Sequence, residues 1–334
     1  MKKIDRLLLK LLAASAILFL FSLVFSNKGK SAQKSVESVI LNQKYKNEVA
    51  EIEITEKGEA GSESITLAQH GDFWLLTKKD ESTNSEFCTL ADKKIINSLI
   101  ENAIKIRKMY TISDSAADYD SLGLGEKNAT TLTFLKNDGT LFTKVHFGHA
   151  DSLKNRIFIR SERSKTAYEC ENDFQQYLTT ETNYWSEGEI LSEIKNPVQI
   201  TLETHATRKA DEGSEVSAQK TLVLDEKSDN FTSKAHALLS LRHGTILSEE
   251  VTTNAIKIAE LTAQDGNGRI TRIAFFEKTE NASDGEAEQS YFYTKAVTPS
   301  EIDSAETRFA FYSEHAAYEI SAWTFGRIKS AFGL

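Results

Sequence analysis

Short stretches in which apolar and polar residues alternate recur along most of the chain. A period of two places the apolar side chains on one face of an extended strand, so each stretch predicts a half-buried β-strand. Turn residues such as Asn137-Asp138-Gly139 separate the stretches and favour antiparallel connections. In the first half of the chain the predicted strands begin at Val49 (VAEIEI), Ser64 (SITLAQ), Phe73 (FWLLTK), Thr130 (TTLTFLK), Phe142 (FTKVHFG) and Asn155 (NRIFIRS).

One segment, from Thr89 to Tyr110, has a helical period instead. Either Thr89 or Asp92 can cap the N-terminus of this predicted helix. We expect its apolar face to pack on the sheet and to bury Trp74, which is the arrangement of an α+β domain. The apolar positions that share this face are Ile95, Ile96, Leu99, Ile100, Ala103 and Ile104.

The pattern repeats once along the chain with a period of about 150 residues, which is the size of a domain. NRIFIRSE (Asn155–Glu162) resembles TRFAFYSE (Thr307–Glu314), and VAEIEI at Val49 resembles PVQITL at Pro197. We therefore predict two related units in which the members of each pair form equivalent strands.

The second unit has strand and helix patterns of its own. KTLVLDEK at Lys220 predicts another strand, and SKAHALLSLRHGTIL from Ser233 predicts a second, shorter helix. The acidic stretch NASDGEAEQ at Asn281 is expected to be an inserted loop between two strands. The predicted fold class is thus α+β, with mostly antiparallel sheet and one main helix in each unit. The expected divisions are residues 1–26 (cytoplasmic tip and transmembrane anchor), 27–48 (linker), 49–190 (first repeat) and 191–334 (second repeat).

The N-terminus predicts a membrane-spanning helix. Basic residues occupy four of the first ten positions, and an unbroken apolar run extends from Leu11 to Phe25. With the leucines just before it, the run can span a bilayer if Lys10 extends its side chain to the interface. The alternative is a cleaved signal peptide, but bulky residues precede Ser26, where cleavage needs small ones. We therefore expect an uncleaved anchor, with the rest of the chain on the extracytoplasmic side.

Composition and charge narrow the range of partners. A chain of 334 residues has about the length of two domains, and 40% apolar residues are enough to build cores. Residues 1–26 hold four bases and one acid, so the remainder has 48 acidic and 36 basic residues and a net charge of −12. Such a surface repels phosphate backbones, and we expect no nucleic-acid partner.

Four short motifs occur in order along the first half of the chain. They are Gly71-Asp72-Phe73-Trp74-x-Leu76, Ala91-Asp92 before the helix, Tyr119-x-x-x-Gly123-Leu124 before a strand, and Phe147-Gly148. Over residues 49–185 their order and spacing resemble the DUF4340 family of bacterial membrane-anchored proteins, whose biochemical function is unknown. Members are often encoded beside ABC transporter subunits of the gliding-motility type. The resemblance therefore implies a membrane protein partner, such as a transporter permease, at the bacterial inner (cytoplasmic) membrane.

The stretch DYDSLGLGEKNATTLTF, Asp118–Phe134, looks like a phosphate-binding loop because two glycines precede Lys127. A P-loop needs G-x-x-x-x-G-K-[ST] between a strand and a helix, whereas here Asn128 follows the lysine and a predicted strand comes next. We interpret Gly123 and Gly125 as residues with positive φ where the chain turns from the helix into the sheet.

The spacing of the histidines does not predict a set of metal ligands. His146 and His149 form H-x-x-H, but residues three apart on a strand face opposite sides, so we expect a surface hairpin. His236 and His243 are seven residues apart, and we interpret them as part of one partly solvated helix face. No nucleophile motif such as G-x-S-x-G occurs. We predict no catalytic, cofactor-binding or metal-binding residue, and no cofactor.

Cys88 and Cys170 are the only two cysteines. Outside the cytoplasm they could form a disulfide, because one precedes the helix and the other ends a predicted strand. A chain of this length needs no covalent link, so we favour two partly buried thiols.

Three classes of function remain open. The first is a non-enzymatic accessory or scaffold subunit of a membrane assembly, which the resemblance suggests is an ABC transporter. The second is a binding module for a cell-envelope ligand such as a glycan, held in a cleft between the two units. The third is an envelope hydrolase, which would need titratable groups that converge in one pocket.

Overall fold

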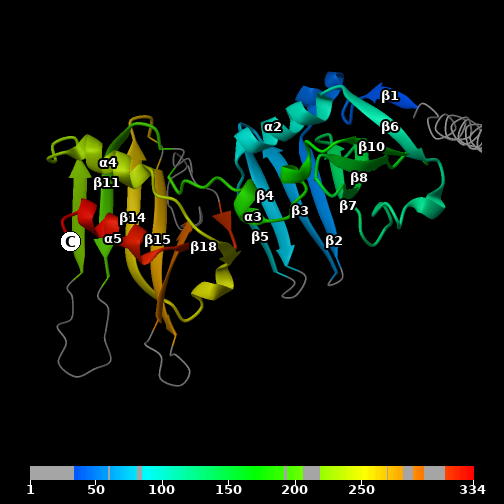
Figure 1. Ribbon diagram of the computed structural model, residues 1–334. Coiled ribbons are helices and arrows are strands. Elements are labelled where there is room, and N and C mark those ends of the chain that lie inside the picture. The colour runs from blue at the N-terminus through cyan, green and yellow to red at the C-terminus, as the bar shows by residue number, and fades with distance from the viewer. Residues whose placement is uncertain are drawn as a thin grey trace, which may run out of the picture.

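The computed structural model describes residues 34–58, 61–80, 85–191, 194–205, 219–268, 270–280, 289–296 and 313–334. Within these ranges the protein is α+β and mostly β, with few helices and two antiparallel sheets of eleven and seven strands. Figure 1 shows the two sheets side by side. The predicted fold class is confirmed at this level.

The predicted anchor, residues 1–26, lies outside the described residues. Across the described ranges, no helix combines the length and the apolar character needed to cross a membrane. Most of Thr307–Glu314 also lies outside, and its last two residues form β17 (Ser313–Glu314). The predicted equivalence of this segment with Asn155–Glu162 therefore stays a prediction.

The first sheet takes all but one of its strands from residues 35–171. Each of the six strands predicted in this half is confirmed, as β2, β3, β4, β7, β8 and β9. In sheet order the strands are β1 (Ser35–Ser38), β6 (Arg107–Ser113), β10 (Ala167–Glu171), β9 (Arg156–Ser161), β8 (Leu141–Ala150), β7 (Thr130–Leu135), β2 (Glu51–Gly58), β3 (Gly61–His70), β4 (Phe73–Asp80), β5 (Ser85–Leu90) and β17.

Helix α2 (Lys93–Ile104) confirms the predicted helix, which is shorter than expected. Asp92 caps it, because its carboxylate accepts the backbone N–H of Lys94 at 2.8 Å. The helix ends at Ile104 because the buried Arg107 donates to the carbonyls of Asn102 and Lys105 and closes its C-terminus. The predicted continuation to Tyr110 is wrong, since Arg107 begins β6.

The core of the first unit lies between this sheet and α2. Trp74 is 3% exposed and belongs to the same apolar cluster as Ile96, Leu99 and Ile100 of the helix. The predicted burial of Trp74 is confirmed.

Part of the predicted linker, residues 27–48, is folded against the first unit. It contains β1 and the 3-10 helix η1 (Gln43–Glu48). Ile40 and Leu41 are buried in the core, and their backbone N–H groups both donate to the carbonyl of Ala103, at 3.1 and 2.9 Å. Two adjacent apolar residues thus fix this segment to the end of α2.

The second sheet is built from the second half of the chain. Strands β11 and β12 confirm the predictions at Pro197 and Lys220, and β15 and β16 flank the predicted loop at Asn281, whose residues 281–288 lie outside the described ranges. In sheet order its strands are β12 (Lys220–Asp225), β11 (Pro197–Thr204), β14 (Ile256–Asp265), β15 (Ile270–Glu280), β16 (Gln289–Ala296), β18 (Ala316–Ile320) and β13 (Ile246–Ser248).

Two helices, rather than the one expected, cover a face of the second sheet (Figure 1). They are α4 (Phe231–Leu239), which confirms the predicted shorter helix, and α5 (Ala322–Ala331). Phe231 and Leu238 of α4 and Phe325 and Ile328 of α5 are buried in the same apolar cluster as the strands. The remaining short elements are η2 (Ala116–Asp118), η3 (Gln175–Tyr177), α3 (Thr182–Trp185) and η4 (Glu249–Thr252).

The two units share residues across the expected boundary. Strand β17, from the second half of the sequence, pairs with β5 and extends the first sheet. Phe87 of β5 is buried in the core of the second unit. The hydroxyl groups of Thr89 and Tyr318, both buried, form a hydrogen bond between the units.

Candidate functional site

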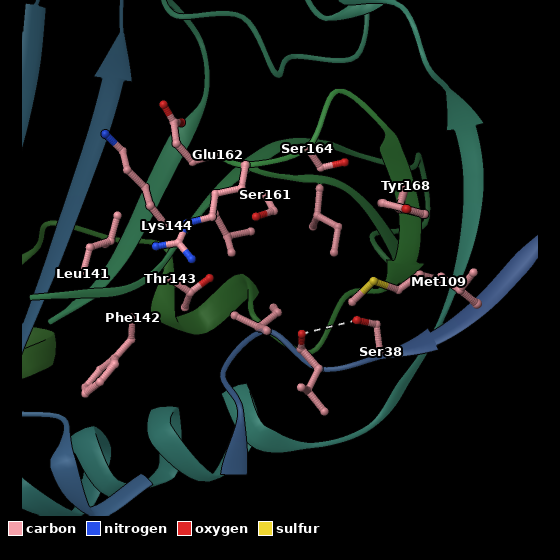
Figure 2. A pocket seen from close by; sticks show the side chains of 16 residues that line it. Ser38, Met109, Leu141, Phe142, Thr143, Lys144, Ser161, Glu162, Ser164 and Tyr168 are labelled. Atoms are coloured by element: carbon pink, nitrogen blue, oxygen red, sulfur yellow. Dashed lines mark hydrogen bonds between the residues drawn. The ribbon is translucent and has the colours of Figure 1, made fainter. Parts of the chain in front are cut away.

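A pocket of about 360 Å³, here called the concave pocket, lies on the inner face of the first sheet (Figure 2). Its lining includes residues from five strands that are consecutive in sheet order: β1, β6, β10, β9 and β8. In a flat sheet the first and last of five strands would be roughly 19 Å apart. They can line one small cavity only because this part of the sheet curls.

The curl coincides with irregular strand pairing. The register shifts between Ala167 and Tyr168 in the β10–β6 ladder, and between Phe147 and Ala150 in the β8–β9 ladder. Bulges of this kind bend a strand and increase its twist. The ladders β2–β3, β3–β4 and β4–β5 have continuous registers, which is typical of a flatter sheet.

Apolar side chains form the floor of the concave pocket. Ile40, Met109, Val145 and Ile159 are each at most 7% exposed. Val145 and Ile159 face the core because the period of two in β8 and β9 alternates buried and solvated positions. Phe142 stacks on Tyr45 of η1, with ring centroids 4.4 Å apart, and lines the cavity as well.

Polar and charged side chains form the rim. Lys144 belongs to β8, whereas Glu162 and Arg163 follow the end of β9 and are exposed. Figure 2 shows Lys144 and Glu162 on one side of the cavity and Tyr168 and Met109 on the opposite side. An apolar floor with a few polar groups around it is the usual design of a small-molecule site.

His146 connects the rim to the neighbouring strand. Its Nε2 contacts the carboxylate of Glu162, and its Nδ1 lies 3.4 Å from the hydroxyl of Thr131. Burial lowers the pKa of His146, and the hydrogen bond with His146 lowers the pKa of Glu162. The neutral imidazole therefore donates to a carboxylate and can accept from the hydroxyl.

This order of hydroxyl, imidazole and carboxylate resembles the relay of a nucleophilic enzyme. Thr131, however, is only 7% exposed and belongs to β7, which lies between the strands β2 and β8. A hydroxyl in that position cannot reach a substrate. The geometry of the three groups therefore fits a structural network at the pocket rim.

The glycine loop joins two strands, β6 and β7, so the predicted turn from helix to sheet is wrong. Gly123 has a φ of +71°, as predicted, and a Cβ there would lie 2.8 Å from the backbone nitrogen of His149. Gly125 lies outside the positive-φ region, and a Cβ there would lie 2.0 Å from the carboxylate of Asp120. Both glycines thus allow close packing of the loop.

The structure does not bring the predicted histidine pairs together as sites. His149 is exposed, whereas His146 is partly buried against Glu162. His236 lies on α4, but His243 follows the end of that helix, so the predicted shared face is wrong. In the part of the chain that the structure describes, no three His, Cys, Asp or Glu side chains are grouped to hold a metal ion.

His243 lies at the junction of the two units instead. Its Nδ1 and Nε2 are each 2.8 Å from a backbone carbonyl, those of Gly244 and Glu187 respectively, and its ring packs on Tyr318. Helix α4 stops before His243 because the chain there pairs with the segment around Ile190, which connects the two units. The backbone N–H of Ile190 donates to the carbonyl of Leu241 at 3.0 Å.

Cys88 and Cys170 carry thiols and are not joined in a disulfide. They belong to β5 and β10, which have six strands between them in the first sheet. Burial raises the pKa of the Cys170 thiol to about 12. A thiol in this state is a poor nucleophile.

The residues of the concave pocket were not predicted from the sequence. The lining runs from Val36 to Tyr168, so its parts are far apart along the chain. The sequence contained one local signal, the Arg-Ser-Glu element that ends at Glu162, which the repeat comparison singled out without a role. Nothing local indicates that Lys144 and Arg163 lie at one cavity.

Comparisons with known proteins give a family but no activity. The family profile described as "Domain of unknown function (DUF4340)" matches residues 74–265. The matched region extends from β4 to the end of β14 and so includes parts of both sheets. No curated protein and no solved structure matches the chain. Because the family match covers more than half of its residues, the chain belongs to the DUF4340 family.

Proposed function

We propose that this protein is a non-enzymatic accessory or scaffold subunit of a membrane assembly, such as an ABC transporter of the gliding-motility type. In this proposal residues 1–26 anchor it in the bacterial cytoplasmic membrane, and the two sheets lie on the extracytoplasmic side. The basic and apolar pattern of the N-terminus supports the anchor. The resemblance to membrane-anchored members of the family supports the role.

The observation that carries the proposal is the edge of the first sheet. Strand β1 is the last strand at one end of the sheet and pairs only with β6 among the described strands. Its outer backbone groups can therefore pair with a strand from a partner. Val36 in this strand is 37% exposed. At the other end, β17 lies next to the second unit, so β1 is the more accessible edge.

The position of β1 suits a partner in the same membrane. Eight residues lie between Ser26, the end of the predicted anchor, and Ser35, the start of β1. The nine extended steps from one Cα to the next span at most roughly 30 Å. A tether of this length raises the local concentration of β1 near other membrane proteins, so a weak interface is sufficient.

Purification from native membranes tests the proposal. We expect the full-length protein, solubilised in detergent, to retain its N-terminal segment in the intact mass and to co-purify with a multi-spanning permease. The account fails if the mature protein begins near Asn27, or if the protein purifies from membranes with no membrane protein bound.

A second candidate function is the binding of a cell-envelope ligand, and the concave pocket favours it. Its volume of about 360 Å³ falls within the roughly 300–1,000 Å³ that is usual for small-molecule sites. Saturable binding of a soluble envelope glycan fragment to the full-length protein would support the glycan as ligand. If NMR signals of residues that line the pocket stay unchanged when the fragment is added, the pocket is not the glycan-binding site.

A further inference from the structure

We propose that the concave pocket binds a small anionic amphiphile, a molecule with one apolar chain and a carboxylate head. This inference rests on the second candidate function, ligand binding, and names the chemical class of the ligand. The accessory role depends instead on the anchor and on the outer backbone groups of β1, a strand whose Val36 and Ser38 also line the pocket.

The floor of the pocket selects an apolar chain. Met109, Val145 and Ile159 are buried apolar side chains that line the cavity, and Phe142 lines it as well. A methylene group that leaves water for such a surface strengthens binding by about fourfold. Shortening the ligand chain by two methylenes is therefore expected to weaken binding roughly 15-fold.

The rim selects a negative head. Two cations, Lys144 and Arg163, line the cavity. The acidic side chain of the lining is Glu162, whose carboxylate is already held by His146. The rim therefore has a local excess of positive charge in a chain that is strongly acidic.

Hydroxyl groups complete the polar side of the pocket. Those of Thr143, Ser161 and Tyr168 line it, and hydroxyls can donate hydrogen bonds to a carboxylate. The volume is near the lower end of the range for small-molecule sites, so the pocket has room for one chain and a small head. A lipid with two chains and a large headgroup does not fit this space.

The methionines provide a site-specific probe. The chain has two, Met1 and Met109, and Met109 lines the pocket. We would label the methionine methyl groups of the full-length protein with ¹³C and record NMR spectra in phosphatidylcholine nanodiscs. The signal of Met109 is assigned with the Met109→Leu variant. Met1 serves as a reference for amphiphile that only enters the bilayer.

Four probes separate the parts of the proposal: dodecanoate, dodecylammonium, acetate and N-acetylglucosamine. We expect dodecanoate to shift the Met109 signal with saturation. Dodecylammonium, which has the same chain and the opposite charge, should bind at least tenfold more weakly. Acetate, which lacks the chain, should leave the signal unchanged, and so should the sugar.

Variants of the rim provide the matched comparison. The double substitution Lys144→Gln and Arg163→Gln should weaken dodecanoate binding on the order of tenfold. Lys154→Gln, which removes an exposed cation from the β8–β9 turn, should leave it unchanged. Ser161→Phe, which places a ring in the cavity, should abolish the shift while an unchanged melting temperature shows that the fold is intact.

Three results would overturn the inference. Equal binding of dodecanoate and dodecylammonium would remove the role of the cations. A saturable response to the sugar alone would assign the pocket to a glycan instead. A Met109 signal that responds to none of the probes would exclude the pocket as this site, and would leave the accessory function untouched.

Discussion

At the scale of a single residue, Cys170 makes the free energy of unfolding depend on pH in the alkaline range. Burial raises the pKa of its thiol from 9.0 to about 12, so the thiol ionises more easily in the unfolded chain. Below pH 9 both states keep the proton, and the contribution to stability is complete. As the pH rises from 9 towards 12, the unfolded state loses its proton first, and the free energy of unfolding falls by about 1.4 kcal/mol at pH 10.

Urea unfolding at pH 8 and pH 10 measures this effect. Cys170→Ala should lower stability at both pH values because it leaves a cavity, but it should lose the part of the pH dependence that belongs to the thiol. Cys88→Ala is the matched control, and it should keep the pH dependence that belongs to the Cys170 thiol. The explanation is wrong if wild type and Cys170→Ala lose the same free energy between the two pH values.

Sequence patterns predicted single residues well where the reason was local. Residue type and position limited the helix cap to Thr89 or Asp92, and the structure has the cap at Asp92. The burial of Trp74 follows from strand alternation next to an amphipathic helix. Arg107 could not be predicted in the same way. It is buried because Asp173, 66 residues further along the chain, accepts hydrogen bonds from it at 3.1 and 2.9 Å.

At the scale of elements, the start of α2 depends on its cap. Asp92→Ala should lower the free energy of unfolding by about 1 kcal/mol, because the N–H of Lys94 loses its acceptor. Asp92→Ser should retain most of the stability, since a serine hydroxyl can accept the same bond. Chemical denaturation of the three proteins compares them directly. Equal stabilities of the alanine and serine variants would contradict the capping role.

The end of α2 shows where elements could not be predicted. The residues after Ile104 continue an apolar spacing that fits a helix, yet Ile106 is 69% exposed and β6 begins at Arg107. The strand forms because β1 and β10 pair with it on either side. Partners that are distant in the sequence decided this element, and local periodicity contains no information about them.

At the scale of the whole molecule, the hydrogen bond between Thr89 and Tyr318 links the two units. Tyr318→Phe should cost about 1–3 kcal/mol, because it removes a partner from the buried hydroxyl of Thr89. Thr89→Val should cost a similar amount. The double variant should lose less than the sum, since neither hydroxyl is then left behind. Thermal unfolding of the wild type, the two single variants and the double variant gives the coupling energy between the two hydroxyl groups. Strictly additive losses of stability would contradict a hydrogen bond between them.

The shape of the first sheet could be predicted only in part. Alternation predicted antiparallel strands, but the concave pocket depends on bulges in β8 and β6 that curl the sheet. Bulges leave no clear pattern in this sequence. The extension of the first sheet by β17 was also not predicted, because the repeat comparison assigned that segment to the second unit.

Photo-crosslinking in living cells tests the accessory role most directly. A photoreactive amino acid replaces Val36 in one variant and Val223 in another. Val36 lies on β1, an edge strand of the first sheet, and Val223 lies on β12, an edge strand of the second sheet. Both valines are exposed, so they form a matched pair. We expect the residue at Val36 to crosslink to a membrane permease and the residue at Val223 not to do so. Crosslinks of equal yield at both positions, or none at Val36, would contradict it.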